Sequence, residues 1–99
     1  MDRILVIDDE PDLLETCREM LREQGYEVAT ELTARAGIAA LESSSFALVL
    51  IDLNLPDLDG LAALGEIRKR DADVATIVIT GFPTIETAVE AVRQGASDY

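Results

Sequence analysis

The stretch Ile4-Leu5-Val6-Ile7-Asp8-Asp9 decides the fold, because a short apolar run in it stops abruptly at two acids. A second stretch, Ala47-Leu48-Val49-Leu50-Ile51-Asp52, has the same form. Short continuous apolar runs are typical of strands buried in a parallel sheet. Ligands of open α/β sheets bind beyond the carboxyl ends of the strands. If the two strands are neighbours, Asp8, Asp9 and Asp52 therefore converge at that edge.

Carboxylates gathered at one edge of a sheet repel one another. Such a cluster either raises the pKa values of its members or requires a cation to neutralise them. Carboxylate oxygens are the ligands that hard divalent cations prefer. The sequence therefore predicts a cation site at this edge, with Mg²⁺ as the leading candidate.

The rest of the sequence alternates between predicted helices and strands. Pro11 begins a helix whose apolar residues follow three- and four-residue spacing and which Gly25 ends. Its expected inward residues are Leu13, Leu14, Cys17, Met20, Leu21 and Gln24. The further elements are an edge strand over 26–30, a helix capped by Thr33 that reaches Ser43, a strand over 47–51, a helix from Leu61 to Arg70, a strand over 74–79, and a helix from Thr84 to Gly95. This alternation predicts a parallel sheet with helices on both faces.

Composition narrows the class of protein. The 99 residues are 48% hydrophobic, which suits one packed domain, and their net charge of −12 argues against direct nucleic-acid contact by this segment. No apolar stretch is long enough to span a bilayer and no leader precedes the first strand, so we expect a cytoplasmic protein. Cys17 is the only cysteine, which excludes an internal disulfide, and the absence of histidine excludes histidine-based catalysis and metal sites.

Further motifs make the chain similar to the receiver domain of two-component response regulators, in the CheY-like superfamily. They are Asp8-Asp9, Asp52, the loop with Pro56 and Asp59-Gly60, Thr80-Gly81, and Gly95-Ala96 ahead of Tyr99. The resemblance covers residues 1–99 and implies a flavodoxin-like, doubly wound α/β fold with strand order 2-1-3-4-5. The sequence shows no counterpart of the fifth strand or the last helix, so we expect a receiver domain that is incomplete at its C-terminus.

The resemblance implies a phosphoacceptor. Asp52 would accept a phosphoryl group from a phosphohistidine on a sensor histidine kinase or a phosphotransfer protein. Mg²⁺ would be held by Asp9, by the Asp52 carboxylate and by the backbone carbonyl of Asn54, with Asp8 acting through water. The chain would not be an enzyme in the usual sense, because it would catalyse only its own phosphorylation and dephosphorylation.

The resemblance also implies a switch and an output. Thr80 would donate its hydroxyl to the phosphoryl oxygens, and Tyr99 would turn inward as Thr80 moves. The family's phosphoryl-contacting lysine, three positions beyond the residue that matches Tyr99, has no substitute, since Lys69 is the only lysine and belongs to a different predicted element. Residues 81–92, with residues 95–99, look most like receivers of nitrogen-regulatory-type transcriptional activators. The expected output is thus transcription, with DNA contacted through an output domain outside this segment.

A Mg²⁺-dependent aspartate-nucleophile phosphatase is the alternative function. Those enzymes carry a general acid two residues after the nucleophile, where this chain has Asn54, which has no titratable proton to donate. A calcium loop that begins at Asp52 is excluded because Pro56 stands where the next ligand should be. Asp57 and Asp59 fit turn and helix-cap roles better than metal binding.

The missing last helix also predicts an uncovered apolar surface. We expect one sheet face to be partly open along Ile4, Val6 and Ile77 or their neighbours, and the strand over 74–79 to form a sheet edge. Association of two chains through this face or edge would give a homodimer, an alternative to the monomer that the sequence leaves open.

Overall fold

The computed structural model describes residues 2–79, 85–93 and 96, in which four strands form one parallel sheet. The strands lie in the order β2-β1-β3-β4, as predicted for these four. The strands are β1 (Arg3–Ile7), β2 (Glu27–Glu31), β3 (Leu48–Asp52) and β4 (Ala75–Ile79). The helices are α1 (Pro11–Glu23), α2 (Ala34–Ser43), α3 (Gly60–Arg70) and α4 (Ile85–Arg93). The described residues contain no fifth strand.

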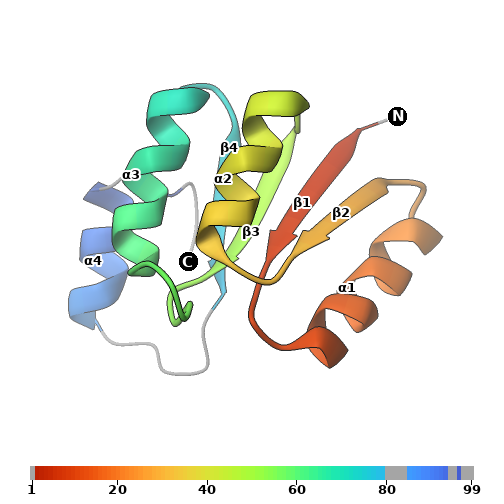
Figure 1. Cartoon of the computed structure of the whole chain (residues 1–99), viewed down its shortest axis with the longest axis horizontal. Coiled ribbons are helices and arrows are strands. Elements are labelled where there is room, and N and C mark those ends of the chain that lie inside the picture. Colours follow the sequence, from red (N-terminus) through yellow and green to blue (C-terminus); the bar gives the residue numbers. More distant parts are fainter. Residues whose placement is uncertain (1, 80–84, 94–95, 97–99) are drawn as a thin grey trace.

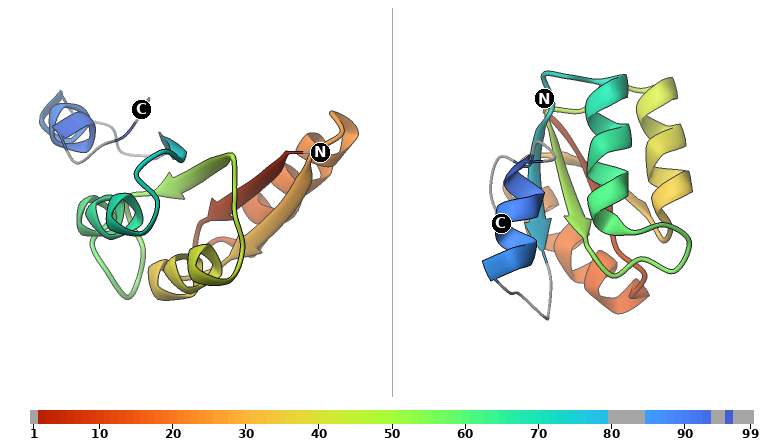
Figure 2. Two further views of the ribbon diagram at one scale, coloured as in Figure 1. Left: turned by 90° about the horizontal axis from the view of Figure 1, so that it is seen from above. Right: turned by 90° about the vertical axis from the view of Figure 1, so that its left-hand side faces the viewer.

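The helices cover both faces of the sheet, which explains why β1 is apolar along its whole length. α2 and α3 lie on one face and α1 lies on the other, while α4 sits past β4 beside α3 (Figures 1 and 2). Leu5 and Ile7 belong to the core on the α2 and α3 side. Ile4 and Val6 point the other way and pack with Leu14 of α1. A central strand buried on both faces needs this continuous apolar run.

The turns follow the predicted chemistry. The Thr33 hydroxyl accepts the Ala36 N–H at 3.2 Å and so caps α2, as expected. Gly25 follows α1 with φ of 92°, a backbone conformation that favours glycine. The expected ends at Thr84 and Gly95 lie outside the described residues. Within the described residues, no helix combines the length and the apolar character needed to cross a bilayer.

The prediction for α1 was wrong at its flanks. The buried stripe is narrower than expected and consists of Leu14, Cys17 and Leu21. Leu13 and Met20 are 39% and 62% exposed, because they lie to the side of this stripe, and Gln24 is exposed beyond the end of the helix. Arg18 is half-buried and donates to the Thr30 hydroxyl of β2 at 2.9 Å. A long charged side chain can lie partly buried in this way while its charged end reaches a polar partner.

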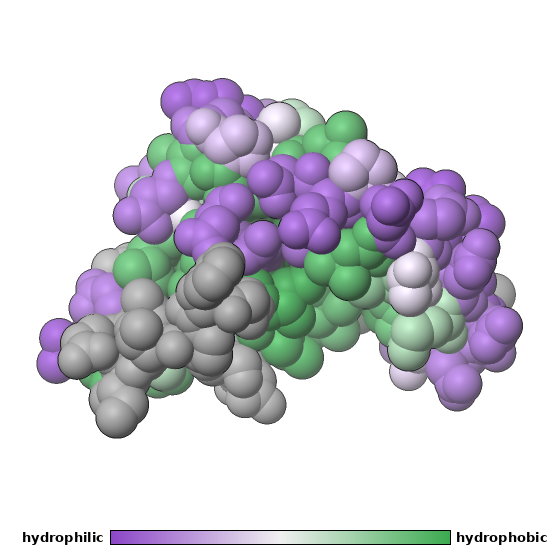
Figure 3. All heavy atoms as spheres, turned by 90° about the horizontal axis from the view of Figure 1, so that it is seen from below, coloured by the Kyte–Doolittle hydropathy of each residue, from purple (hydrophilic) through white to green (hydrophobic). Residues whose placement is uncertain are grey.

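The open sheet face differs from the prediction in the same region. Ile4 and Val6 are 3% and 0% exposed, because α1 covers them. Ile77 is half-buried, as are Leu50, its partner in the strand register, and Ile79. In the space-filling view from below, hydrophobic residues gather around the middle of the molecule (Figure 3). The less covered part of the sheet is therefore along β3 and β4, and β4 is an edge of the described sheet, as expected.

The orientation of α1 can be tested with two neighbouring leucines. Leu14→Ala should lower the free energy of unfolding by about 2–5 kcal/mol, because it leaves a cavity between α1 and β1. Leu13→Ala should cost no more than about 1 kcal/mol, because much of the Leu13 side chain is already in water. Urea unfolding at equilibrium measures both. Equal losses would contradict the orientation of α1 described here.

Candidate functional site

The structure brings Asp8, Asp9 and Asp52 together at the carboxyl edge of the sheet. β1 and β3 pair in parallel with Ile7 opposite Ile51, so the acids that follow these two residues emerge side by side. One carboxylate oxygen from each of the three lies within 4.8 Å of the others. The convergence that the two apolar runs predicted is thus present in the fold.

Asp8 is the most constrained of the three acids. It is 2% exposed, and its Oδ1 accepts the Glu10 N–H at 3.0 Å. Burial is the main cause that raises the pKa of Asp8 above its usual value, and the charges of Asp52, Asp9 and Glu10 raise it further. The Glu10 N–H opposes this shift but does not cancel it. The pocket therefore favours either a proton on Asp8 or a cation beside it.

Asp52 is held by the loop that follows it. Its Oδ1 accepts the Asn54 N–H at 3.1 Å, which orients the carboxylate. The base of the loop is closed where the Gly60 N–H donates to the Leu53 carbonyl at 3.1 Å. A Cβ on Gly60 would collide with the Leu53 backbone and stand 2.8 Å from its carbonyl oxygen. Glycine is required at this position because the two backbone segments approach so closely.

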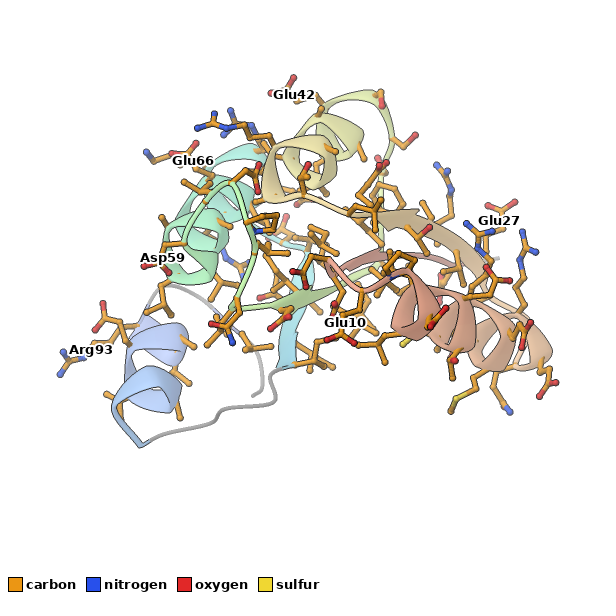
Figure 4. All side chains as sticks on the ribbon, turned by 60° about the horizontal axis from the view of Figure 1, so that its bottom comes forward. Glu10, Glu27, Glu42, Asp59, Glu66 and Arg93 are labelled. Carbon is orange, nitrogen blue, oxygen red and sulfur yellow. The ribbon has the colours of Figure 1, made fainter. Side chains whose placement is uncertain are left out.

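Asp57 and Asp59 cap helices, as their predicted roles require. Asp59 Oδ1 accepts the Leu61 N–H at 2.8 Å at the start of α3. With the lower edge of the molecule brought forward, Asp59 and Glu10 are seen where α3 and α1 begin (Figure 4). The two oxygens of Asp57 accept the N–H groups of Ala34 and Arg35, at 2.9 and 3.0 Å, at the start of α2. Sequence reasoning did not find this link to α2.

The remaining predicted site residues have different outcomes. Asn54 is exposed in the loop after β3, next to the acid cluster through its N–H contact with Asp52. Thr80 and Tyr99 lie outside the described residues. The Lys69 side chain is 73% exposed at the end of α3, and its Nζ lies 3.4 Å from Glu66 Oε1. Lys69 belongs to a different element from those that carry the acids, as predicted.

The donor set suits a hard divalent cation. All three converging side chains offer the oxygen ligands that such cations prefer. Burial first, and then the charges of Asp52, Asp9 and Glu10, raise the pKa of Asp8, and a cation beside it would favour its ionised form. The arrangement could neutralise its own repulsion, and that of an incoming anionic group, by binding such a cation.

Comparison with known proteins agrees with this geometry. Residues 4–99 match the family model of the response regulator receiver domain. Over 96 residues the chain is 36% identical to the transcriptional regulatory protein ZraR of Salmonella typhimurium. The matched region covers 97% of this chain and 22% of ZraR. The chain thus spans less than a quarter of the length of this curated relative.

Two solved structures have the same fold over the whole of this chain. A CheY-like response regulator receiver domain protein from Methanospirillum hungatei has a TM-score of 0.97 and 34% identity, and the match covers 100% of this chain and 79% of that one. The response regulator TrrA from Thermotoga maritima, solved in complex with Mg²⁺ and BeF, has a TM-score of 0.90 and 34% identity, with 100% and 84% covered. The chain belongs to the response regulator receiver domain family of two-component systems.

Proposed function

We propose that this receiver domain, spanning residues 1–99, accepts a phosphoryl group on Asp52 in a Mg²⁺-dependent reaction. The observation that carries the proposal is the convergence of three carboxylates, with oxygens within 4.8 Å of one another, at the carboxyl edge of a receiver-family sheet. Phosphoryl transfer depends mainly on positioning and on neutralising charge. A cluster of this kind suits both needs.

The surroundings of Asp8 and Asp52 differ, and the difference supports a separate role for each. Asp8 is buried and already accepts a backbone N–H, so a bulky phosphoryl donor could not reach it. Its role would be to support the bound cation rather than to act as the nucleophile. Asp52 is half-buried, lies at the end of β3 and is oriented by the Asn54 N–H. A carboxylate oxygen of Asp52 would form the bond to phosphorus while the bond from phosphorus to the donor nitrogen breaks, and the electron pair stays on that nitrogen.

The roles of the other residues complete the proposal. Asp9, Asp52 and the Asn54 carbonyl would bind Mg²⁺, and Asp8 would act through water. Bound Mg²⁺ would supply the positive charge that offsets the phosphoryl oxygens. Thr80 would donate to those oxygens, and Tyr99 would follow its movement as the switch.

Partners follow from the family and from charge. The phosphoryl donor would be a sensor histidine kinase or a phosphotransfer protein in the cytoplasm. ZraR is named a transcriptional regulatory protein, which supports transcription as the output. The net charge of −12 supports DNA contact through an output domain rather than through these residues. A homodimer remains part of the proposal, with the less covered side of β3 and β4 as one surface available to it.

The phosphatase alternative is not favoured. Its general acid would stand at residue 54, where the structure places an exposed asparagine whose N–H serves the Asp52 carboxylate. The family match also assigns the chain to receivers, not to phosphatases.

Phosphorylation of Asp52 can be tested directly. Incubation of the full chain with acetyl phosphate or a phosphorylated histidine kinase, in the presence of Mg²⁺, should add one phosphoryl group, measured by intact mass. Asp52→Asn should abolish the addition. Asp59→Asn is the matched control, since asparagine caps a helix as well as aspartate, and it should be labelled like the unchanged protein. Full labelling of the Asp52→Asn variant, mapped to another residue, would refute the assignment.

The charge repulsion at Asp8 predicts how stability depends on pH and on Mg²⁺. The pKa of Asp8 is raised in the folded chain, so its contribution to stability is present at acid pH and is lost as the pH rises through the folded-state value. Asp8→Asn removes the charge and should raise the metal-free melting temperature at pH 7. It should also remove most of the stabilisation that Mg²⁺ gives by mass action.

The control for this experiment is Asp73→Asn, which makes the same change of net charge at an exposed site before β4, at the opposite edge of the sheet. It should leave both the metal-free melting temperature and the Mg²⁺ response close to those of the unchanged protein. If Asp8→Asn behaved like Asp73→Asn in thermal melts with and without Mg²⁺, the repulsion in the pocket would be negligible.

A further inference from the structure

One side chain joins the loop between β3 and α3 to a different helix. The oxygens of Asp57 accept the N–H groups of Ala34 and Arg35, which lie 23 and 22 residues earlier in the chain. N–H groups in the first turn of a helix have no acceptor within the helix itself, and the helix dipole favours a negative charge beside them. The Asp57 side chain is 22% exposed, and of its two contacts the one with Ala34 is partly buried while the one with Arg35 faces water. They are the kind of hydrogen bond to a charged acceptor that is stronger than a neutral one.

The same loop carries the residue nearest to the phosphoacceptor. Asn54 donates its N–H to Asp52, and the loop is pinched shut one residue earlier by the hydrogen bond from Gly60 to the Leu53 carbonyl. Residues 54–59 therefore form a loop whose two ends are joined by the hydrogen bond between Gly60 and Leu53. Leu55 and Leu58 rest against the core, and Asp57 is the polar anchor that fixes the far side of this loop.

α2, whose first N–H groups bond to Asp57, also packs closely against β1. Gly37 of α2 packs so closely on Ile7 that a Cβ at this position would lie 2.7 Å from Ile7 Cγ1. Ile7 directly precedes Asp8. The first turns of α2 thus pack directly against the strand that leads to Asp8 and Asp9. Asp57 therefore connects the loop that follows β3, by way of α2, to the end of β1 from which Asp8 and Asp9 emerge.

We propose that Asp57 is a positioning residue for the magnesium site, acting by fixing residues 54–59, and with them the Asn54 backbone and the Asp52 carboxylate, against α2. This proposal rests on the Mg²⁺ role proposed above. Groups that hold metal ligands in place without touching the metal commonly change metal affinity by about 10–100-fold when removed. The backbone N–H groups of Arg35 and Ala34 also lower the pKa of the Asp57 carboxyl, so the anchor stays ionised at neutral pH.

Thr33 provides a matched control within the same helix turn. Its hydroxyl accepts the Ala36 N–H at 3.2 Å, so Thr33→Ala also removes an acceptor from the start of α2. No hydrogen bond of Thr33 reaches the loop after β3 among the described residues. A purely structural role of Asp57 in capping α2 predicts similar effects for Thr33→Ala and Asp57→Ala, whereas positioning of the loop predicts different ones.

The experiment measures Mg²⁺ affinity calorimetrically in the full chain and in three variants, at a temperature where all are folded. Asp57→Ala should weaken Mg²⁺ binding about tenfold. Asp57→Asn keeps an oxygen acceptor and should restore most of the affinity. Thr33→Ala should bind Mg²⁺ like the unchanged protein. Equal affinity in Asp57→Ala and Thr33→Ala would overturn the proposal.

A second measurement separates this proposal from the proposed function. In metal-free protein, the amide resonance of Asn54 should shift in Asp57→Ala and stay in place in Thr33→Ala, because only the first variant frees the loop. Failure of the unchanged protein to bind Mg²⁺ would refute the metal role. If the amide resonance of Asn54 did not shift in Asp57→Ala, the positioning role would be refuted, whether or not the unchanged protein binds Mg²⁺.

Discussion

Repulsion among three carboxylates is the constraint on which the rest of this structure depends. Parallel pairing of β1 with β3 brings Asp8 and Asp52 to the same edge, and Asp9 joins them there. A fold gains nothing in stability by gathering like charges, one of them in a nearly fully buried side chain. Such a cluster fits the functional site proposed above, in which a bound cation would offset the repulsion.

The surrounding structure supplies the rigidity that this arrangement needs. β1 is buried by helices on both of its faces, which fixes the strand that ends in Asp8. The loop after Asp52 is closed at its base by Gly60 and its end is held by the Asp59 cap of α3. Asp57 adds a link to α2. Asp8 and Asp52 are therefore held by backbone contacts, so that a cation or a phosphoryl group would meet a site already shaped for it.

Much of this could be predicted from the sequence because the signals are local. An apolar run followed by an acid marks both a buried strand and a residue at its carboxyl end, so β1, β3 and the acid cluster follow directly. Thr33 and Asp59 were recognisable as caps from their position before helical patterns. The helix α1 was harder, since the apolar spacing admits a wide inner face and only packing shows that Leu13 and Met20 fall outside it.

Contacts between distant parts of the chain carried no such signal. The hydrogen bonds of Asp57 join a loop to a helix that lies more than twenty residues earlier, and an aspartate in a turn gives no indication of this partner. The burial of Ile4 and Val6 likewise depends on where α1 lies on the sheet. In both cases the tertiary arrangement decides, and periodicity alone does not contain it.

The most direct test of the central claim is a measurement of the pKa of the Asp8 carboxyl itself, by carbon NMR of the side-chain carboxyl during a pH titration. In metal-free protein the account predicts a pKa above the ordinary value of about 3.9 for an aspartate, caused by burial and by the neighbouring acids. Saturating Mg²⁺ should bring this pKa down, because the cation favours the ionised form. An Asp8 that titrates at the ordinary value, with no response to Mg²⁺, would contradict the account.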